Sequence, residues 1–421
     1  MILIASIFII GYLFITFEGT VNINKAATAL LTGVFCWVGH WYFAADAHIV
    51  SEELMQHLGE ISGILFFLMG AMTIVELIDA HDGFYLITKA IKTTDKRKLL
   101  WIIGMCTFVL SAILDNLTTT ILMISLLRSI ITDKNDRWFF LGIVIIAANA
   151  GGAWSPIGDV TTTMLWIGGQ ITSKAVIMKL FIPSLVCLII PLVVVTVSIK
   201  GNIQKNVNQT LISDPSNNFG RNLIFFCGMG VLLFIPVFKN VTHLPPFVGM
   251  LFGLGIVWVV SELIHKDKDT EDKDALSVVY ALKKIDTPSI LFFLGILMAI
   301  AAMQSSGILV LIADALHRNI PSENVTVILI GLCSAIVDNV PLVAASIGMY
   351  DLEQYPTDHN FWQFLAYCTG TGGSALIIGS AAGVAVMGSE RMDFFWYLKK
   401  ISWLALLGYF AGAITFVLFF A

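Results

Sequence analysis

The string Ser111-Ala-Ile-Leu-Asp115-Asn116 interrupts a long apolar stretch of the sequence, and Ser334-Ala-Ile-Val-Asp338-Asn339 interrupts a second one in the same way. A carboxylate inside the hydrocarbon region of a membrane is costly, so an aspartate at that depth indicates a functional site. The alternative is that each Asp-Asn pair only caps the tip of a helical hairpin. Because the same pattern occurs twice, we consider a purely structural role the weaker explanation.

The composition identifies the chain as a polytopic membrane protein. Of its 421 residues, 57% are hydrophobic and only 13% are charged, and the mean hydropathy is +0.86. Soluble globular domains carry about 25% charged residues, so that class is excluded. The net charge is −5, and the sequence contains no basic domain that could bind nucleic acid. The six cysteines occur singly, without the spacing of a zinc site, and indicate packing residues.

Apolar runs long enough to cross about 30 Å of hydrocarbon predict about ten transmembrane helices in an all-α fold. The first run lacks the basic flank and the cleavage site of a signal peptide, so we expect it to be a retained span. Two further stretches, 99–131 and 324–349, are each interrupted halfway by Asp-Asn and predict re-entrant helical hairpins. The spans are expected at 2–17, 26–43, 61–79, 138–170, 180–199, 222–238, 246–264, 288–304, 361–389 and 401–420.

The chain also contains an internal duplication. The sequence Ile-Leu-Phe-Phe-Leu occurs at 64–68 and at 290–294, and Gly151-Gly152 has a counterpart at Gly372-Gly373. Together with the two Asp-Asn pairs, these islands keep one order and a nearly constant spacing, which indicates two repeats. We expect the first repeat at 1–200, a polar cytoplasmic linker at 201–221 and the second repeat at 222–421.

The placement of charges predicts the orientation of the two repeats, because lysine and arginine accumulate in cytoplasmic loops. Basic residues flank the first hairpin, at 96–98 before it and at Arg137 after it. Acidic residues follow the second hairpin, at Asp351, Glu353 and Asp358. The first hairpin is therefore expected to open to the cytoplasm and the second to the outside, with both termini outside. Two copies in opposite orientations form the inverted repeat typical of secondary transporters.

Each repeat has a second interruption after its hairpin, within the spans 138–170 and 361–389. The first contains glycines, Pro156 and Asp159, and the second has Ser380 in the place of Asp159. Glycine and proline weaken a helix, and a broken helix is tolerated in a membrane only where protein or a water-filled cavity lines the break. Freed carbonyls, together with Asp, Asn and Thr oxygens, are the hard ligands that a cation needs. The sequence therefore predicts a cation site at two broken helices.

The Asp-Asn tips, the block Asn149-Ala-Gly-Gly-Ala-Trp-Ser-Pro-Ile-Gly-Asp159-Val-Thr-Thr and the block Gly370-Thr-Gly-Gly-Ser374 resemble the NhaD-type sodium/proton antiporters of the ion transporter superfamily. The resemblance runs across the whole chain. It implies a transport domain, built from the hairpins and broken helices, that moves in an elevator-type manner against a homodimeric scaffold. It also implies exchange of Na⁺, and of Li⁺, for H⁺ across the bacterial cytoplasmic (inner) membrane, with no enzymatic activity and no cofactor.

The resemblance further implies which residues handle the ions. In the first repeat these are Asp115, Asn116, Asn149, Asp159, Thr161 and Thr162. In the second repeat they are Ser334, Asp338, Asn339, Ser374 and Ser380. A first Na⁺ site is expected at Asp115, Asn116, Asn149 and Asp159, and a second at Asp338 and Asn339.

Three alternatives stay open. A cation-coupled carboxylate or arsenite carrier of the same superfamily is one, although related dicarboxylate carriers have Ser-Asn-Thr at the tips and two aspartates would repel a dianion. An intramembrane aspartyl protease is another, but Pro156 replaces the first glycine of its Gly-x-Gly-Asp pattern. The third is that Thr161, Thr162 and Thr163 only bond to helix carbonyls.

Overall fold

The computed structural model describes residues 1–16, 18–21, 23–44, 46–85, 93–203, 218–266, 276–320 and 322–420. Within these ranges the chain is helical and forms no β-sheet, which confirms the all-α membrane class. By length and composition, seven helices in the described part of the chain could cross a membrane. They are α4 (Ala47–Ala80), α6 (Lys96–Leu114), α10 (Ser173–Ser198), α11 (Asn218–Thr242), α12 (Pro246–Ile264), α15 (Thr287–Ser305) and α22 (Ser402–Phe420).

The number of about ten crossings stays a prediction. Four of the expected spans correspond to α1 (Ile2–Thr16), to α3 (Lys25–Phe43) and to two helices that are broken in the middle. In addition, α6, the first arm of the first hairpin, is itself long and apolar enough to cross. Residues 204–217 of the expected linker lie outside the described residues, and α11 begins within that linker at Asn218.

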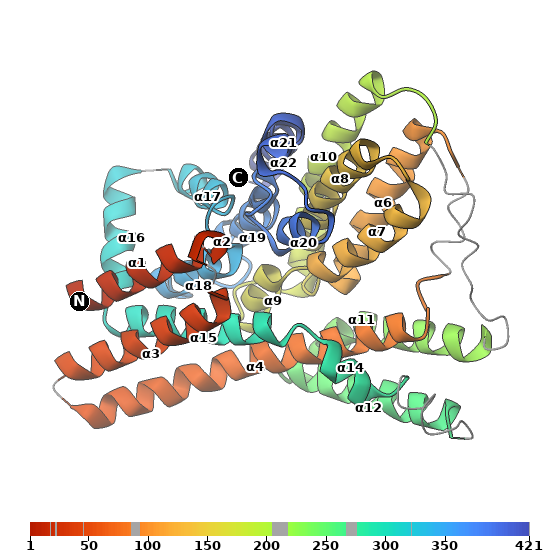
Figure 1. The fold of residues 1–421 in the computed structure, drawn as a ribbon. Helices are drawn as coiled ribbons and strands as arrows, with labels where there is room; N and C mark the ends of the chain where they lie inside the picture. The colour runs from red at the N-terminus through yellow and green to blue at the C-terminus, as the bar shows by residue number, and fades with distance from the viewer. Residues whose placement is uncertain are drawn as a thin grey trace.

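A layer of long helices, α1, α3, α4, α11, α12 and α15, forms one side of the molecule (Figure 1). In it, α3 packs against α15, and α4 packs against both α12 and α15. The contact between α3 and α15 depends on Gly295, where an added Cβ would lie 2.4 Å from the backbone nitrogen of Leu30. No side chain fits at that distance, so glycine lets the two backbones touch.

The remaining long elements form a bundle above this layer in Figure 1. Within the bundle, α6 packs on α8, α17 packs on α19, and α10 packs on α22. Besides α6, α10 and α22 it contains α7 (Asn116–Ile130), α8 (Lys134–Ala153), α9 (Val160–Ile167), α17 (Glu323–Cys333), α18 (Asn339–Met349), α19 (Asn360–Gly372) and α20 (Ala381–Glu390). Short elements are α2 (Glu18–Val21), α14 (Val278–Lys284), α16 (Ile308–Asn319), η2 (Gly373–Ala375) and α21 (Phe394–Lys400).

The helices are interrupted where the sequence predicts. In the bundle, α6 and α7 are separated by Asp115 alone, and α17 and α18 by 334–338. The breaks between α8 and α9 and between α19 and α20 fall at 154–159 and 373–380. The two tips therefore differ in length. In the longer one, the Ser334 hydroxyl donates to the carbonyl of Gly331 (2.7 Å).

The buried apolar side chains form two hydrophobic cores. The larger core fills the bundle, with side chains such as Phe108, Phe140 and Trp362 that are at most 1% exposed, and it continues into α4, α11 and α12 of the layer. The smaller core joins α1, α3, α4 and α15. Met164 of α9 and Val340 of α18 belong to this smaller core, so these two half-helices bring the bundle into contact with the layer.

Candidate ion site at the starts of four half-helices

Four half-helices begin at the breaks, in the middle of the bundle, and each begins at a capping side chain. A helix start leaves backbone N–H groups unpaired and carries a partial positive charge, so a carboxylate is stabilised there. The capping residues are Asp115 for α7, Asp159 for α9, Asp338 for α18 and Ser380 for α20. The sequence predicted freed carbonyls together with side-chain oxygens at the breaks; the structure adds that the carboxylates lie at the amide ends of the half-helices.

Each aspartate uses one carboxylate oxygen for this capping. The distances from amide nitrogen to Oδ1 are 2.8 Å for Thr118 and Asp115, 3.0 Å for Thr161 and Asp159, and 3.1 Å for Val340 and Asp338. The second oxygen, Oδ2, is then available for other contacts. A single carboxylate can therefore hold a helix start and bind a cation at once.

Asp159 lies at the centre of the network. Its Oδ2 accepts a hydrogen bond from the side-chain amide of Asn116 (3.0 Å) and a longer one from Asn339 (3.4 Å). These three side chains are at most 6% exposed. Asn116 starts α7 in the first hairpin and Asn339 starts α18 in the second, so both hairpin tips meet at one carboxylate. Asp159 and Asn116 of the first expected Na⁺ site and Asn339 of the second thus share one hydrogen-bond network, whereas the two other aspartates, Asp115 and Asp338, line the cavity beside it.

Asn149 connects the two broken helices. Its side-chain amide donates to the hydroxyls of Ser374 and Ser380, both at 2.9 Å, and its carbonyl accepts from Asn116 at 3.1 Å. All four side chains are buried. Asn149 thus bridges the second broken helix and the first hairpin, as a member of the first broken helix.

A small cavity of about 50 Å³ lies beside this network, and its wall includes Asp115, Asp159 and Asp338. Such a space is large enough to hold a water molecule or a small cation. Within the described ranges, no three His, Cys, Asp or Glu side chains lie close enough together to hold a metal ion. The site instead mixes carboxylate, amide and hydroxyl oxygens, which suits a cation that binds and leaves.

Asp115 holds a strained backbone conformation at the first tip. Its φ of 75° and ψ of 163° lie in a region that residues other than glycine rarely adopt, at a cost of about 1 to 3 kcal/mol. Thr118 offsets this cost, because its hydroxyl donates to Oδ2 (2.9 Å) and its amide to Oδ1. Asp338, the counterpart at the second tip, has an unstrained φ of −48°.

The hydroxyl groups expected at the site divide into two kinds. Thr162 donates to the carbonyl of Asp159 (2.9 Å), and Ser334 donates to backbone carbonyls of α17 and α19. Their protons therefore bond to the backbone, and for Thr162 this agrees with the alternative left open by the sequence. The Thr161 hydroxyl is buried near the Asp159 carboxylate, but it makes no hydrogen bond.

Three residues at the site escaped sequence reasoning. Thr118 could have been found, since it stands three residues after a capping aspartate. Tyr12, whose hydroxyl accepts from the Asp338 amide (3.0 Å), and Lys25 come from α1 and α3, far away in the sequence. Lys25 lines the small cavity, and also a cavity of about 290 Å³ on the other side of Asp338. No local signal pointed to the last two.

Comparison with known proteins identifies the family. The family described as "Citrate transporter" matches residues 12–360. The chain belongs to this family. Its relatives include "Sodium/proton antiporter 1" of Arabidopsis thaliana, 48% identical over 98% of this chain and 71% of the relative. "Sodium/proton antiporter 2" of the same plant is 46% identical, over 98% of both chains.

Relatives at lower identity carry the name NhaD. "Na(+)/H(+) antiporter NhaD" of Alkalimonas amylolytica is 30% identical to this chain, over 94% of this chain and 86% of the relative. The NhaD-type resemblance of the sequence is thereby confirmed. So is the expectation that this member of the citrate transporter family is a transporter and not an enzyme.

Proposed function

We propose that this protein exchanges Na⁺, and also Li⁺, for H⁺ across the bacterial cytoplasmic membrane. The observation that carries the proposal is the group of three aspartates, Asp115, Asp159 and Asp338, around one small cavity. If Na⁺ and H⁺ compete for the same carboxylates, each excludes the other. Exchange follows when only the loaded forms change sides.

The arrangement of the half-helices favours a cation over a carboxylate substrate, although the family description names citrate. Starts of helices are common binding sites for anions. Here three of the four helix starts already hold a carboxylate of the protein itself. An anionic substrate would meet these like charges, whereas a cation neutralises them.

Asn116 and Asn339 supply a way to alternate between the two ions. Both donate an amide hydrogen to Oδ2 of Asp159, and an asparagine that rotates about its last bond presents an oxygen in place of the NH₂ group. A cation at Asp159 would be held by these oxygens. Protonation of Asp159 would release the cation and let the amides turn back.

The packing of the helices supports the inverted repeat and the elevator-type movement. The pair α3 and α15 is matched by α12 and α4, and the pair α7 and α20 by α18 and α9. In the repeats 1–200 and 222–421, α3 is equivalent to α12, α4 to α15, α7 to α18 and α9 to α20. Each contact in one pair therefore has a symmetric counterpart in the other. We infer that the bundle is the mobile transport domain and that the layer is the scaffold, which forms the homodimer.

The exchange activity can be tested with purified protein in proteoliposomes that report internal pH. An imposed gradient of Na⁺ or Li⁺ should drive protons in the opposite direction. Gradients of K⁺ and of a dicarboxylate measured in parallel establish selectivity. Uptake of labelled dicarboxylate without cation-driven proton movement would show a carboxylate carrier instead.

The asymmetry between the repeats predicts graded effects on Na⁺ affinity. Asp338→Asn keeps a good helix cap but removes a charge, so the half-saturating Na⁺ concentration should rise about tenfold, with some proton coupling left. Ser380→Ala removes only a neutral oxygen and should raise the half-saturating Na⁺ concentration about threefold. Unchanged Na⁺ affinity with less folded protein in Asp338→Asn would make the second tip a structural cap.

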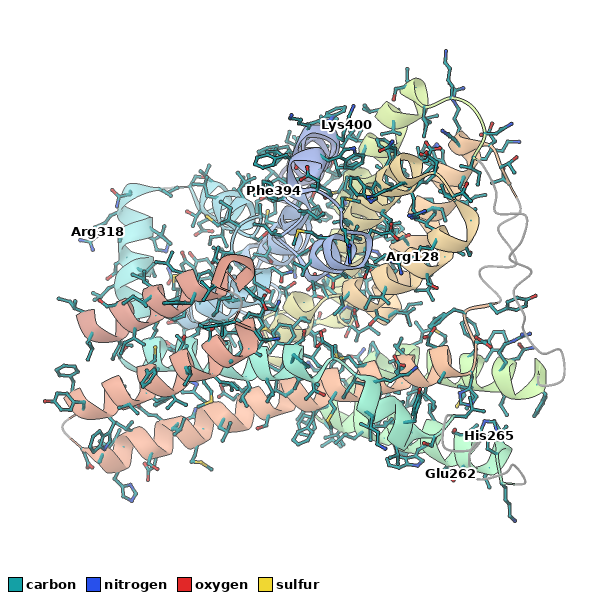
Figure 2. The ribbon with its side chains drawn as sticks, viewed as in Figure 1. Arg128, Glu262, His265, Arg318, Phe394 and Lys400 are labelled. Atoms are coloured by element: carbon teal, nitrogen blue, oxygen red, sulfur yellow. The ribbon has the colours of Figure 1, made fainter. Side chains whose placement is uncertain are left out.

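The orientation of the repeats predicts the accessibility of introduced cysteines. Ser322, Thr357, Thr94 and Asn135 are exposed, and cysteines at the first two should react from outside the cell, those at the last two only from the cytoplasm. Figure 2 shows Arg318, which precedes the second hairpin, far from His265 at the end of α12. This separation agrees with a position of the two residues on opposite faces of the membrane. The background must lack the native Cys333, which is exposed. Labelling of all four positions from one face would exclude the inverted repeat.

A further inference from the structure

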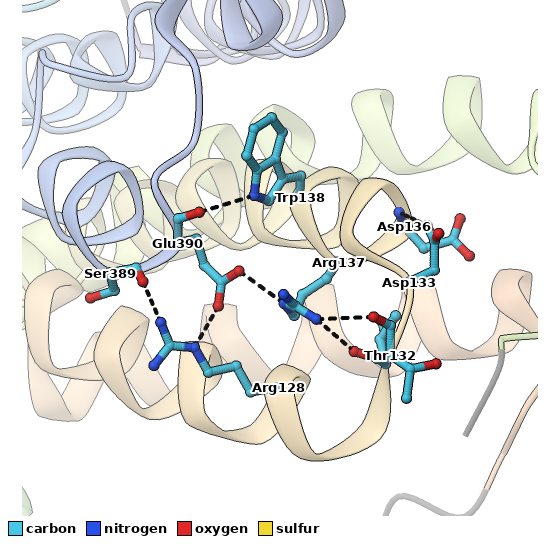
Figure 3. Close-up of polar contacts among 9 residues, drawn as sticks. Arg128, Thr132, Asp133, Asp136, Arg137, Trp138, Ser389 and Glu390 are labelled. Atoms are coloured by element: carbon cyan, nitrogen blue, oxygen red, sulfur yellow. Dashed lines mark hydrogen bonds and ion pairs between the residues drawn. The ribbon is translucent and has the colours of Figure 1, made fainter. Parts of the chain in front are cut away.

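A buried carboxylate joins three helices at the end of the bundle that the charge pattern places at the cytoplasm (Figure 3). Glu390 is the last residue of α20, and its side chain is 3% exposed. Nε of Arg128, in α7, donates to Oε1 at 2.5 Å, and Nε of Arg137, in α8, donates to Oε2 at 2.9 Å. We call Glu390, Arg128 and Arg137 the clamp.

Backbone contacts reinforce the clamp. Arg128 also donates to the carbonyl of Ser389, and the indole of Trp138 donates to the carbonyl of Glu390 (3.3 Å). Arg137 donates to the carbonyl of Ile131 (3.0 Å), which follows the last turn of α7. The end of α7, the start of α8 and the end of α20 are therefore held as one unit.

The same three helices are joined a second time at the ion site. There the connection runs from Asn116 at the start of α7 through Asn149 near the end of α8 to Ser380 at the start of α20. Since helices are stiff, the clamp at one end sets the spacing of these side chains at the other. The first repeat contributes α7 and α8, and the second contributes α20.

The chemistry of the clamp favours a positioning role over simple stabilisation. A buried ion pair costs desolvation, and well-packed apolar side chains often hold helices together as well or better. Each oxygen of the Glu390 carboxylate accepts a hydrogen bond from one guanidinium group. Such directional bonds fix the position of one helix along another, which non-directional apolar contacts do not. Arg137 ties α8 to α20 and to the end of α7, and Arg128 adds a direct contact between α7 and α20.

We propose that Glu390 is a positioning residue for cation binding, which holds α7 and α20 in the register that brings Asn116, Asn149 and Ser380 together at the ion site. This inference rests on the proposed exchange function. Weakening the clamp should therefore change the affinity for Na⁺ before it changes the amount of folded protein.

The test uses Glu390→Gln, which keeps the size of the side chain and removes its charge. The half-saturating Na⁺ concentration for exchange should rise about tenfold, with the maximal rate within about twofold of the unchanged protein. Arg128→Gln should give a similar rise. The double variant should give no more than the larger single effect, because both changes break the same contact.

A matched control is Asp136→Asn. Asp136 pairs with Lys96 at 2.7 Å, a contact that joins α8 to α6 within the first repeat. This variant should leave Na⁺ affinity unchanged. A second readout is the Na⁺ concentration that raises the melting temperature of the detergent-solubilised protein, which reports binding without transport.

The possible outcomes separate the two ideas. Binding of Na⁺ without exchange by the unchanged protein would refute the proposed function, while the melting measurement would still test the clamp. An unaltered Na⁺ dependence in Glu390→Gln, additive effects in the double variant, or an equal rise in Asp136→Asn would each overturn the positioning role. Absence of any Na⁺ binding by the unchanged protein would overturn it as well.

Discussion

Asp159→Asn is expected to abolish Na⁺-driven proton movement in proteoliposomes, a loss of at least about 100-fold, or about 2.7 kcal/mol. The amide keeps the size of the side chain and still caps α9, since asparagine is a good capping residue. It loses the charge that holds the cation and the proton that competes with it. The amides of Asn116 and Asn339, which now donate to Oδ2, would face a group without a charge.

Asp115→Asn should have the same effect, because Asp115 lines the same cavity. The matched control is Asp133→Asn. Asp133 caps α8 by accepting from the amide of Asp136 (2.8 Å), so the control makes the same chemical change at a helix start outside the site. It should retain exchange within about twofold. Near-normal exchange by Asp159→Asn would remove that residue from the mechanism.

Gly372→Ala is expected to prevent folding of most of the protein. A Cβ at Gly372 would lie 1.9 Å from the carbonyl oxygen of Gly331, which is backbone and cannot move aside as a side chain can. The helices α17 and α19 would be forced apart next to the second tip. We expect a loss of about 3 kcal/mol or more, seen as a lower melting temperature and less monodisperse protein in size-exclusion chromatography.

The matched control for this change is Gly388→Ala. Gly388 lies in α20 of the same repeat, and nothing would come within 4 Å of its added Cβ. Alanine there should be neutral or stabilise by about 0.5 to 1 kcal/mol, because glycine is unfavourable inside a helix. Equal melting temperatures for the two variants would show that the contact with Gly331 is not essential.

The repeated glycines illustrate how far local sequence reasoning reaches. Gly151 and Gly372 lie where the sequence predicts the breaks, yet Gly151 is still inside α8 and Gly372 is the last residue of α19. Their reason is tertiary: a Cβ at Gly151 would lie 2.3 Å from the carbonyl oxygen of Phe108 in α6. The duplication was visible in the sequence, but which helix packs against each glycine was not.

The sequence by itself determined the membrane class, the positions of the breaks and the three aspartates placed at them. These features depend on residues within one helical turn, because a polar residue, a glycine or a proline acts on the backbone next to it. Pro156 and Asp159 thus located the break between α8 and α9 without any knowledge of the packing.

Only the tertiary structure decided which oxygens and amides meet. Asn149 and Ser380 are 231 residues apart in the sequence, yet the side-chain nitrogen of Asn149 lies 2.9 Å from the hydroxyl oxygen of Ser380. Glu390 and Arg137, which form an ion pair, are 253 residues apart. Such contacts arise when helices of the two repeats pack together, and no local pattern encodes which side chain a helix will face. The network around Asp159 and the clamp at Glu390 therefore follow from packing, which is why the aspartates were predicted and Glu390 was not.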